Sequence, residues 1–320
     1  MNEIASITLP FFGLIALGYG TAQWRKAPAE GLAWLDFFVL YLALPSLFFK
    51  LIGQTPLEEL TNWSFILTAI FGTYCTFAIA FSIMALTSRG NIPEATIQGL
   101  VGAYSNSGYM APGLTLAAFG TAAAVPTALI FSFENAMLFA LVPLMMALGS
   151  TERTSPMVIL LRIGKKIFFH PIIIAILAGF AAAATDFEPP RALDALLTLL
   201  SGAAAPCALF ALGVSLGLRP PKRIGMELPL LVFIKLFVHP MVVYLLLSWV
   251  GGFDAVWVFT AVLMAALPPA ANVFVLARQY ETYVERASTG ILIGTLVSIL
   301  TVTGILSLIF TGALPIDPFH

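Results

Sequence analysis

Three ionisable residues lie within long apolar runs of the sequence: Glu134, Lys235 and His239. Lys235 and His239 are four residues apart, so they share one face of a helix. Charged side chains are costly in a membrane and are often functional there. We expect Glu134 to bind and release a proton, because removal from water favours the neutral form of a carboxyl group. Lys235 and His239 could neutralise a bound carboxylate, or Lys235 could form a purely structural pair with Glu134.

Two further clusters contain residues that interrupt helices. The first spans residues 102–113 and combines Gly, Ser, Asn and Pro, and the second spans residues 265–272 and contains two consecutive prolines. Proline removes a backbone donor and clashes with the preceding turn, while Gly and Asn tolerate irregular dihedral angles. The alternative is a proline kink without function. The candidate binding residues in these clusters are Ser105, Asn106, Ser107, Gly108, Pro112, Pro268, Pro269 and Asn272.

An interrupted helix is suited to binding an anion. A helix that restarts directs unpaired N–H groups and about half a positive charge towards its N-terminus. In a membrane, the freed backbone groups must be buried in protein or line a wet cavity. Two breaks that meet would therefore form an anion site near the middle of the membrane.

The composition indicates a membrane protein. Of the 320 residues, 60% are hydrophobic and 10% are charged, and the mean hydropathy is +0.98. A soluble domain is about 45–50% apolar and about 25% charged, so water is excluded as the main solvent. The net charge of −1 gives no attraction to nucleic acid. The two cysteines indicate neither a disulfide framework nor a metal cluster, and no cofactor is expected.

Ten apolar runs are long enough to cross a bilayer, which takes about 20 residues. The fourth and ninth runs contain the two clusters described above. The sequence therefore predicts an all-α integral membrane protein with ten transmembrane helices, of which the fourth and ninth are broken. The runs cover residues 3–23, 33–53, 62–87, 94–119, 121–149, 168–186, 192–218, 228–250, 254–279 and 285–312.

The distribution of Lys and Arg predicts the orientation. If the ten runs all cross the bilayer, one set of loops carries only Lys50 and Arg191. Positively charged loops are typically cytoplasmic, so we expect both termini to lie outside the cytoplasm. The other set of loops carries Arg25, Lys26, Arg89, Arg153, Arg162, Lys165, Lys166, Arg219, Lys222, Arg223, Arg278 and Arg286.

An offset of 161 residues aligns the two halves of the chain. It also aligns the first predicted span with the sixth and the second with the seventh. Because each half then has five spans, two homologous halves must insert with opposite orientation, as in many secondary transporters. The aligned pairs are Pro10 with Pro171, Gly18 with Gly179, Pro45 with Pro206 and Phe49 with Phe210.

Residues 106–114 resemble a motif of a known family. The run Asn-Ser-Gly-Tyr-Met-Ala-Pro-Gly-Leu is similar to the crossover motif in the fourth helix of the auxin efflux carrier family, with one residue fewer between the aromatic residue and the proline. Residues 266–280 are similar to the ninth helix of that family, where Leu-Pro precedes an apolar stretch ending in Ala-x-x-Tyr. Ser105 departs from the pattern, because many members have proline there. The length and the predicted spans agree over the whole chain.

The resemblance implies a fold of two inverted five-helix repeats. Residues 1–60 and 151–225 would form a scaffold, and residues 61–150 and 226–320 would form a transport domain that moves as an elevator. The resemblance also implies a homodimer that associates through the scaffold.

The resemblance further implies a secondary transporter of small carboxylates, such as malate, malonate or auxin-like aromatic acids. The chain lacks the long central loop of the long plant carriers, so it is similar to bacterial members, which lie in the cytoplasmic membrane. In the family, polar residues of the second and fifth helices border the site. Ser46, Glu134 and Asn135 are therefore further candidates.

Other functions stay open at this point. Sodium-coupled carriers of the bile-acid type share the ten-span plan, and a channel or a receptor could have the same fold. The two clusters contain no Asp or Glu, which disfavours sodium or proton antiport. An enzyme is not expected, because the apolar runs contain no nucleophile–base set and no metal-binding spacing. The chain also lacks the phosphate-binding loop of an ATP-driven pump.

Overall fold

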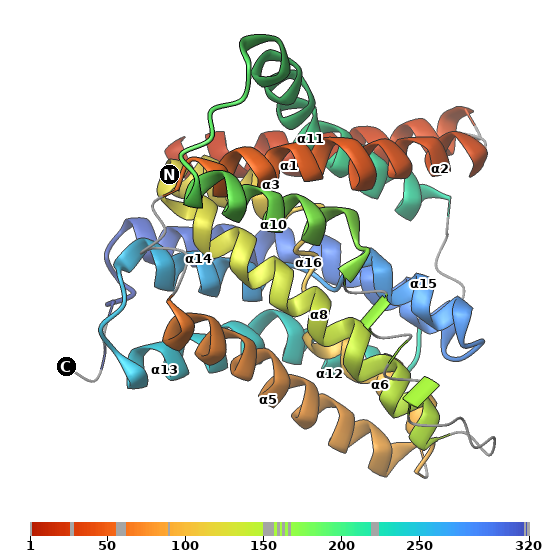
Figure 1. Ribbon diagram of the computed structural model, residues 1–320. Coiled ribbons are helices and arrows are strands. Elements are labelled where there is room, and N and C mark those ends of the chain that lie inside the picture. The colour runs from red at the N-terminus through yellow and green to blue at the C-terminus, as the bar shows by residue number, and fades with distance from the viewer. Residues whose placement is uncertain are drawn as a thin grey trace.

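The computed structural model describes residues 2–25, 29–55, 62–88, 90–149, 157–158, 161, 164–165, 168–218, 224–316 and 318. These residues form a bundle of helices (Figure 1). The helices are α1 (Asn2–Arg25), α2 (Ala29–Phe38), η1 (Val39–Ala43), α3 (Leu44–Gly53), α5 (Trp63–Thr87), α6 (Ile92–Ala103), α7 (Ala111–Phe119), η2 (Gly120–Ala123), α8 (Ala124–Leu148), α10 (Pro171–Ala184), α11 (Arg191–Gly217), α12 (Leu228–Phe233), η3 (Ile234–Val238), α13 (His239–Val250), α14 (Ala255–Ala266), α15 (Ala271–Gln279) and α16 (Val284–Phe310).

Seven helical stretches in the described part of the chain are long and apolar enough to cross a membrane. The apolar helices α10 and α14 are shorter, so this count is lower than the ten predicted spans. The difference arises where the chain is interrupted or a helix is short. The seven stretches are Ile4–Trp24, Glu30–Gly53, Trp63–Thr87, Ala111–Leu148, Arg191–Gly217, Leu228–Val250 and Val284–Phe310.

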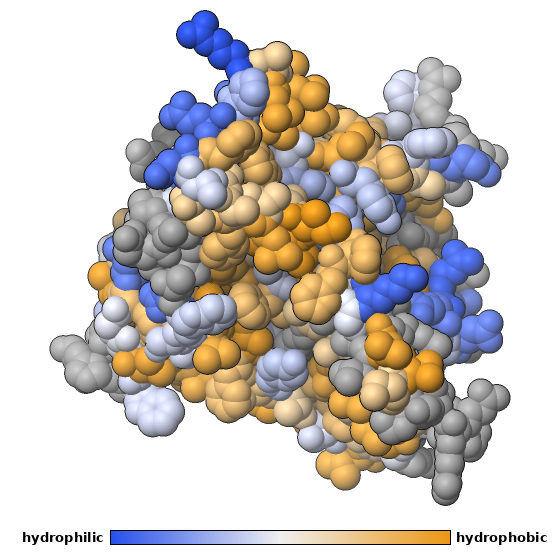
Figure 2. Space-filling view, in the orientation of Figure 1, coloured by the Kyte–Doolittle hydropathy of each residue, from blue (hydrophilic) through white to orange (hydrophobic). Residues whose placement is uncertain are grey.

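The outer surface is as apolar as a membrane requires. Large hydrophobic side chains such as Leu67 of α5, Leu199 of α11 and Leu300 of α16 are exposed. Hydrophobic residues cover much of the face seen in Figure 2, and hydrophilic residues gather towards its edges. Several apolar helices with such a surface describe a multi-pass membrane protein.

Short polar side chains define where three helices begin. The side chain of Asn62 accepts a hydrogen bond from the N–H of Phe65 at the start of α5, and Asn91 caps α6 through the N–H of Glu94. Asp254 caps α14 in the same way. These caps satisfy backbone donors that a helix leaves free in its first turn.

Two groups of helices pack mainly within themselves. α3 lies against α10 and α11, and α1 lies along α11. α5 packs against α6 and α13, and α14 and α15 pack against α16. In Figure 1 the helices α1, α2 and α11 lie on one side of the bundle, and α5 and α13 lie on the other. Helices α7, α8 and α16 contact both groups.

Glycines allow close approach within the first group of helices. A Cβ atom added to Gly18 of α1 would overlap the carbonyl oxygen of Phe210 of α11, and one added to Gly179 of α10 would lie 3.1 Å from the carbonyl oxygen of Phe49 of α3. These four residues are two of the pairs that the offset of 161 residues aligns. Each glycine of one half thus packs on the phenylalanine of the other half.

A π-helical turn, η3, separates α12 from α13 just before Pro240. Because proline has no N–H and its ring crowds the preceding turn, the widened hydrogen-bonding pattern of a π-turn accommodates it. This turn carries Lys235, and His239 follows at the first position of α13. Both side chains are fully buried, which contrasts with the exposed outer surface.

Candidate functional site

The two predicted helix breaks lie next to each other. The first break, residues 104–110, joins α6 to α7, and the second break, residues 267–270, joins α14 to α15. The N–H of Asn106 donates to the carbonyl of Pro268 at 2.9 Å, and the N–H of Ala270 donates to the carbonyl of Tyr104 at 3.1 Å. Ser105 and Pro269 form an isolated antiparallel bridge. Each break therefore satisfies backbone groups that the other leaves free.

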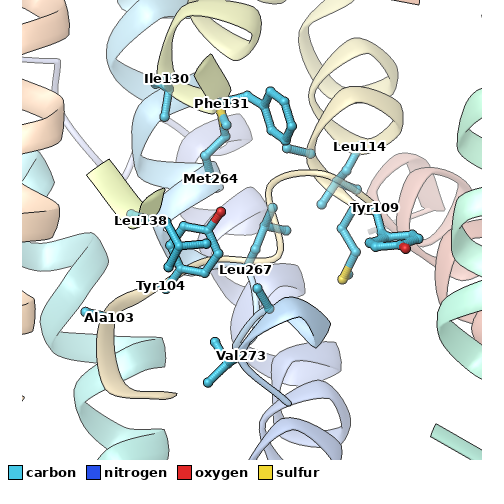
Figure 3. Packing of buried hydrophobic residues seen from close by; sticks show 14 of the residues in the cluster. Ala103, Tyr104, Tyr109, Leu114, Ile130, Phe131, Leu138, Met264, Leu267 and Val273 are labelled. Atoms are coloured by element: carbon cyan, nitrogen blue, oxygen red, sulfur yellow. The ribbon is translucent and has the colours of Figure 1, made fainter. Parts of the chain in front are cut away.

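The buried cluster around these breaks is largely apolar. Figure 3 shows Tyr104 and Leu267 within it, with Phe131 and Leu138 of α8 nearby. Tyr104 and Leu267 are 2% and 0% exposed. In such surroundings a polar group without a partner costs more than it would at a surface, so the polar atoms of the breaks identify candidate ligand contacts.

Two side-chain atoms of the first break are buried without a hydrogen-bond partner. They are Oγ of Ser105 and Nδ2 of Asn106, and Asn106 is 1% exposed. A buried donor without a partner costs about 1–3 kcal/mol. The amide of Asn106 and the hydroxyl of Ser105 are thus available to a ligand that enters between the breaks.

The other predicted residues of the breaks have different surroundings. Gly108 lies against the ring of Phe131, where an added Cβ would be 3.2 Å from Cε2. Pro112 occupies the first turn of α7, and Asn272 occupies the first turn of α15. Ser107 lies near Ser105, whose carbonyl accepts a bond of 3.4 Å from the Ser107 hydroxyl.

Asn135 is close to the first break, but its amide is engaged. Its Nδ2 donates to the carbonyl of Phe131 at 2.8 Å, and its Oδ1 accepts from the hydroxyl of Tyr104 at 3.1 Å. The side chain therefore holds Tyr104 at the start of the break. Ser46 of α3 is 6% exposed, and its hydroxyl donates to the carbonyl of Leu42 on its own helix at 2.7 Å.

Glu134, Lys235 and His239 are brought together by a fourth residue, Thr73. The hydroxyl of Thr73 donates to Oε1 of Glu134 at 3.3 Å and lies 3.1 Å from Nε2 of His239. Nδ1 of His239 lies 3.0 Å from Nζ of Lys235, and Nζ also donates to the carbonyl of Ala265 at 2.5 Å. We call these four side chains the buried polar chain. It runs from α8 to the last turn of α14, just before the second break.

Sequence reasoning missed Thr73, because one threonine in an apolar helix is ordinary. It also missed the contact between Tyr109 of the first break and Asp36 of α2, in which the tyrosine hydroxyl donates to Oδ1 at 3.1 Å. Asp36 carried a usable signal, since it is an acidic residue within the second apolar run. It links the first break to a helix of the other packing group.

A second polar cluster lies outside the spans, where α15 turns into α16. The hydroxyl of Tyr283 donates to Oε1 of Glu227 at 2.6 Å, and Arg286 donates to the same oxygen at 3.2 Å. Partial burial opposes ionisation of Glu227, but the bonds from Tyr283 and from its own backbone, together with the charge of Arg286, outweigh it and lower its pKa. Burial first, and the nearby Glu227 next, raise the pKa of Tyr283.

Within the described part of the chain, no group of three His, Cys, Asp or Glu side chains could hold a metal ion. The polar side chains of the breaks carry amide and hydroxyl groups, while the carboxyl of Glu134 and the amine of Lys235 lie on the neighbouring elements α8 and η3. Such a set suits reversible binding of an anion and the movement of a proton.

Comparison with known proteins supports a transport role. A family model described as "Membrane transport protein" matches residues 4–306. A protein of Rhizobium meliloti (strain 1021) named "Putative malonate transporter" is 54% identical over 319 residues, which cover 100% of both chains. An "Uncharacterized transporter" of Methanothermobacter thermautotrophicus is 25% identical over 291 residues, which cover 90% of this chain and 92% of that one.

Proposed function

The chain belongs to the auxin efflux carrier family of membrane transport proteins, and from this premise we propose that it is a secondary transporter of small carboxylate anions. Malonate is the first candidate substrate, because the Rhizobium relative that is 54% identical carries that name. Malate and auxin-like aromatic acids are the other candidates. The transporter would operate in the bacterial cytoplasmic membrane with both termini outside the cytoplasm.

The observation that carries this proposal is the unpaired amide of Asn106 at the paired breaks. A carboxylate oxygen placed there would accept a hydrogen bond from Nδ2, and the hydroxyl of Ser105 would supply another. The helices α7 and α15 restart at the breaks, and their first-turn N–H groups favour negative charge. Hydrogen bonds to a charged group are worth about 1.5–3 kcal/mol each, enough for reversible binding.

We propose that the two packing groups correspond to a scaffold and a moving transport domain. Residues 1–60 and 151–225 would form the scaffold, and residues 61–150 and 226–320 the transport domain. The packing of α1 and α3 against α11, and the exchanged contacts of Gly18 and Gly179, support two related halves of five helices. The breaks would then be the crossovers of an elevator, and the scaffold would also form a homodimer interface.

Glu134 is the group that we propose to bind a coupling proton. It is 2% exposed and lies on α8, whereas the described residues of the two breaks contain no carboxylate. Sodium sites of carriers usually combine acidic side chains with the backbone carbonyls of broken helices, and the described residues of the two breaks offer no acidic side chain. A sodium-coupled carrier of the bile-acid type is therefore the second outcome that an experiment has to separate.

Thermal stabilisation of the purified protein tests the proposal. A ligand that binds only the folded state raises the melting temperature. The panel contains malonate, malate, succinate, indole-3-acetate and taurocholate, each with and without sodium and at two pH values. We expect a sodium-independent shift with one of the small carboxylates, and no such shift in the variant Asn106→Ala.

The other outcomes redirect the proposal. A shift that requires sodium would favour a symporter of the bile-acid type. A shift that persists unchanged in Asn106→Ala would show that the carboxylate binds elsewhere. Saturating uptake into proteoliposomes separates a carrier from a channel, because channel flux does not saturate.

A further inference from the structure

The buried polar chain contains two opposite charges that do not form a direct ion pair in the described residues. Lys235 and His239 are 0% exposed, and Glu134 and Thr73 are each 2% exposed. Glu134 and Lys235 interact electrostatically, but hydrogen bonds connect them only through Thr73 and His239. A lysine without solvent contact in a membrane helix requires a function or a partner.

The chemical types of the four side chains determine the direction of every hydrogen bond within the buried polar chain. A charged lysine can only donate, so Nδ1 of His239 accepts from it and the ring proton sits on Nε2. Nε2–H then donates to the hydroxyl oxygen of Thr73, and the hydroxyl proton points to Oε1 of Glu134. All three bonds therefore point from the lysine to the carboxylate.

We propose that this chain is a proton path by which Glu134 takes up one proton for each carboxylate anion that binds at the breaks. The inference rests on the transport function proposed above. Three protons each move to the next group. One passes from Nζ of Lys235 to Nδ1 of His239, one passes from Nε2 of His239 to the hydroxyl oxygen of Thr73, and the hydroxyl proton of Thr73 passes to Glu134. This internal transfer leaves a neutral amine and a neutral carboxyl. Lys235 then regains its charge by binding one proton from the solution, so the net change is one proton gained, which is held at Glu134.

Charge balance explains why uptake of the proton and binding of the anion occur together. In the empty site, Glu134 and Lys235 cancel each other's charge. Lys235 bonds the carbonyl of Ala265, two residues before the second break, so an anion at the breaks would be close to this lysine. A second negative charge would leave the buried region unbalanced, which is strongly unfavourable. Protonation of Glu134 restores neutrality once Lys235 has regained its charge from the solution, because the carboxylate at the breaks then takes the place of Glu134 as the partner of Lys235.

The surroundings leave few other groups that could take the proton. The titratable groups that interact directly with Glu134 are Lys235 and Tyr104 of the first break, and His239 reaches it through Thr73. Tyr104 donates its proton to Asn135. Among the helices that pack against α8, the helices α7, α10 and α14 contain no ionisable residue, and Lys50 of α3 is bonded to Asp194. Tyr74 of α5 is 37% exposed on the outer surface.

Infrared difference spectroscopy of the purified protein tests the path without any substrate. Spectra recorded over a pH series should contain the C=O band of a protonated carboxyl that is absent in Glu134→Gln. The pH dependence of this band should differ in Thr73→Val, which keeps the shape but removes the hydroxyl, and should return in Thr73→Ser. The matched controls are Glu30→Gln, an exposed carboxylate of α2, and Thr68→Val, whose hydroxyl bonds Ser64 of its own helix.

Proton uptake on binding tests the stoichiometry, with malonate as the probe. In a weakly buffered solution with an indicator dye, the wild type should take up about one proton per malonate bound, and its affinity should weaken as the pH rises. Glu134→Gln resembles the protonated state, so it should bind malonate without proton uptake and with an affinity that does not change with pH.

The outcomes separate this inference from the proposed function. A carboxyl band that survives in Glu134→Gln, or proton uptake that is unchanged in that variant, overturns the proton path. If calorimetry detects no malonate binding to the wild type, the proposed substrate is wrong, and the infrared comparison decides the path on its own. If Glu134→Gln does not fold, the neutral pair Glu134→Gln/Lys235→Met replaces it, and this variant should also lack the carboxyl band.

Discussion

The two helix breaks are close partners in space but differ in composition. The first break contains Ser105, Asn106 and Ser107, and the second contains Pro268 and Pro269. Prolines have no N–H, so the second break has few donors that need a partner. Its carbonyl at Pro268 accepts from the first break. The first break, in contrast, keeps two polar side-chain atoms without a partner.

From this difference we propose that the first break supplies the groups that bind the ligand, and that the second break fixes the position of the backbone. The second break contains a rigid pair of prolines, of which Pro269 lies against Gly294 of α16, and this pair fixes the backbone that bonds Asn106. The polar side chains of the first break can then remain unpaired inside a folded protein, since the neighbouring backbone pairs stabilise the region. Variants at equivalent places in the two breaks should therefore affect different properties.

The largest expected difference is between Asn106→Ala and Asn272→Ala. Loss of one hydrogen bond to a carboxylate costs about 1.5–3 kcal/mol, which is about a 10- to 100-fold loss of affinity, so transport of the bound anion should fall to background in Asn106→Ala. The bond from the backbone of residue 106 to Pro268 survives, and the melting temperature should change little. Initial uptake rates in proteoliposomes measure the effect.

Asn272 is half-buried in the first turn of α15 and should matter less. Uptake by Asn272→Ala should stay well above that of Asn106→Ala at equal protein amounts. Equal losses in the two variants would mean that both breaks contribute side chains to the ligand, and the proposed division between ligand binding and backbone position would be wrong.

An intermediate effect is expected from added methyl groups at Gly294 and Gly108. In Gly294→Ala the new Cβ would lie 2.5 Å from Cδ of Pro269, a ring fixed to the backbone of the second break. Overpacking of this kind costs about 1–3 kcal/mol. In Gly108→Ala the neighbour is the ring of Phe131 at 3.2 Å, which can shift, so the loss of stability should be smaller. Melting temperatures of both variants in detergent measure the difference, and a larger loss in Gly108→Ala would contradict the rigid role of the second break.

The smallest effect concerns the far ends of the two restarted helices. α7 ends at Phe119 and is followed by Gly120, which has φ of 69°. The turn after α15 is held by the hydrogen bonds that Tyr283 and Arg286 donate to Glu227. Because the pKa of Glu227 is lowered from 4.5 in the folded protein, its contribution to stability is present above pH 4.5. It is lost as the pH falls through the folded value.

Melting curves over a pH series measure this contribution. Glu227→Gln should melt slightly below the wild type at neutral pH, and the two curves should approach each other as the pH falls below 4.5. Glu188→Gln, at an exposed carboxylate, is the matched control. A difference between wild type and Glu227→Gln that does not change with pH would exclude this ionic contribution.

The elements around the site could be predicted from the sequence, because Pro, Gly and Asn interrupt helices for local reasons. The sequence predicts breaks within residues 102–113 and 265–272, and α6 and α14 end there. Three-dimensional partners could not be predicted in the same way. Thr73 gives no local signal, and the pairing of Asn106 with Pro268 depends on how α6 and α14 meet.

The prediction of ten spans depends on the lengths of the individual helices, which local hydropathy and helix-breaking residues predict poorly. Seven described stretches meet the length and hydropathy that a span requires. α14 is short because Pro268 and Pro269 end it, and the residues before α10 lie partly outside the described part of the chain. Ser46 is a further example, since its hydroxyl bonds its own helix, an arrangement that the residue type alone does not reveal.

The close approach of α1 and α11 has a practical consequence for spectroscopy. An added Cβ at Gly18 would overlap the backbone at Phe210, and one at Gly213 would overlap the backbone at Ile15, so neither helix can slide without breaking this contact. Probes on Leu17 and Leu199, which are 64% and 76% exposed, should report one constant distance throughout the transport cycle. Once Cys75 and Cys207 are replaced, the labels at positions 17 and 199 provide a constant reference distance. The displacement of a label on any other helix can be measured against it.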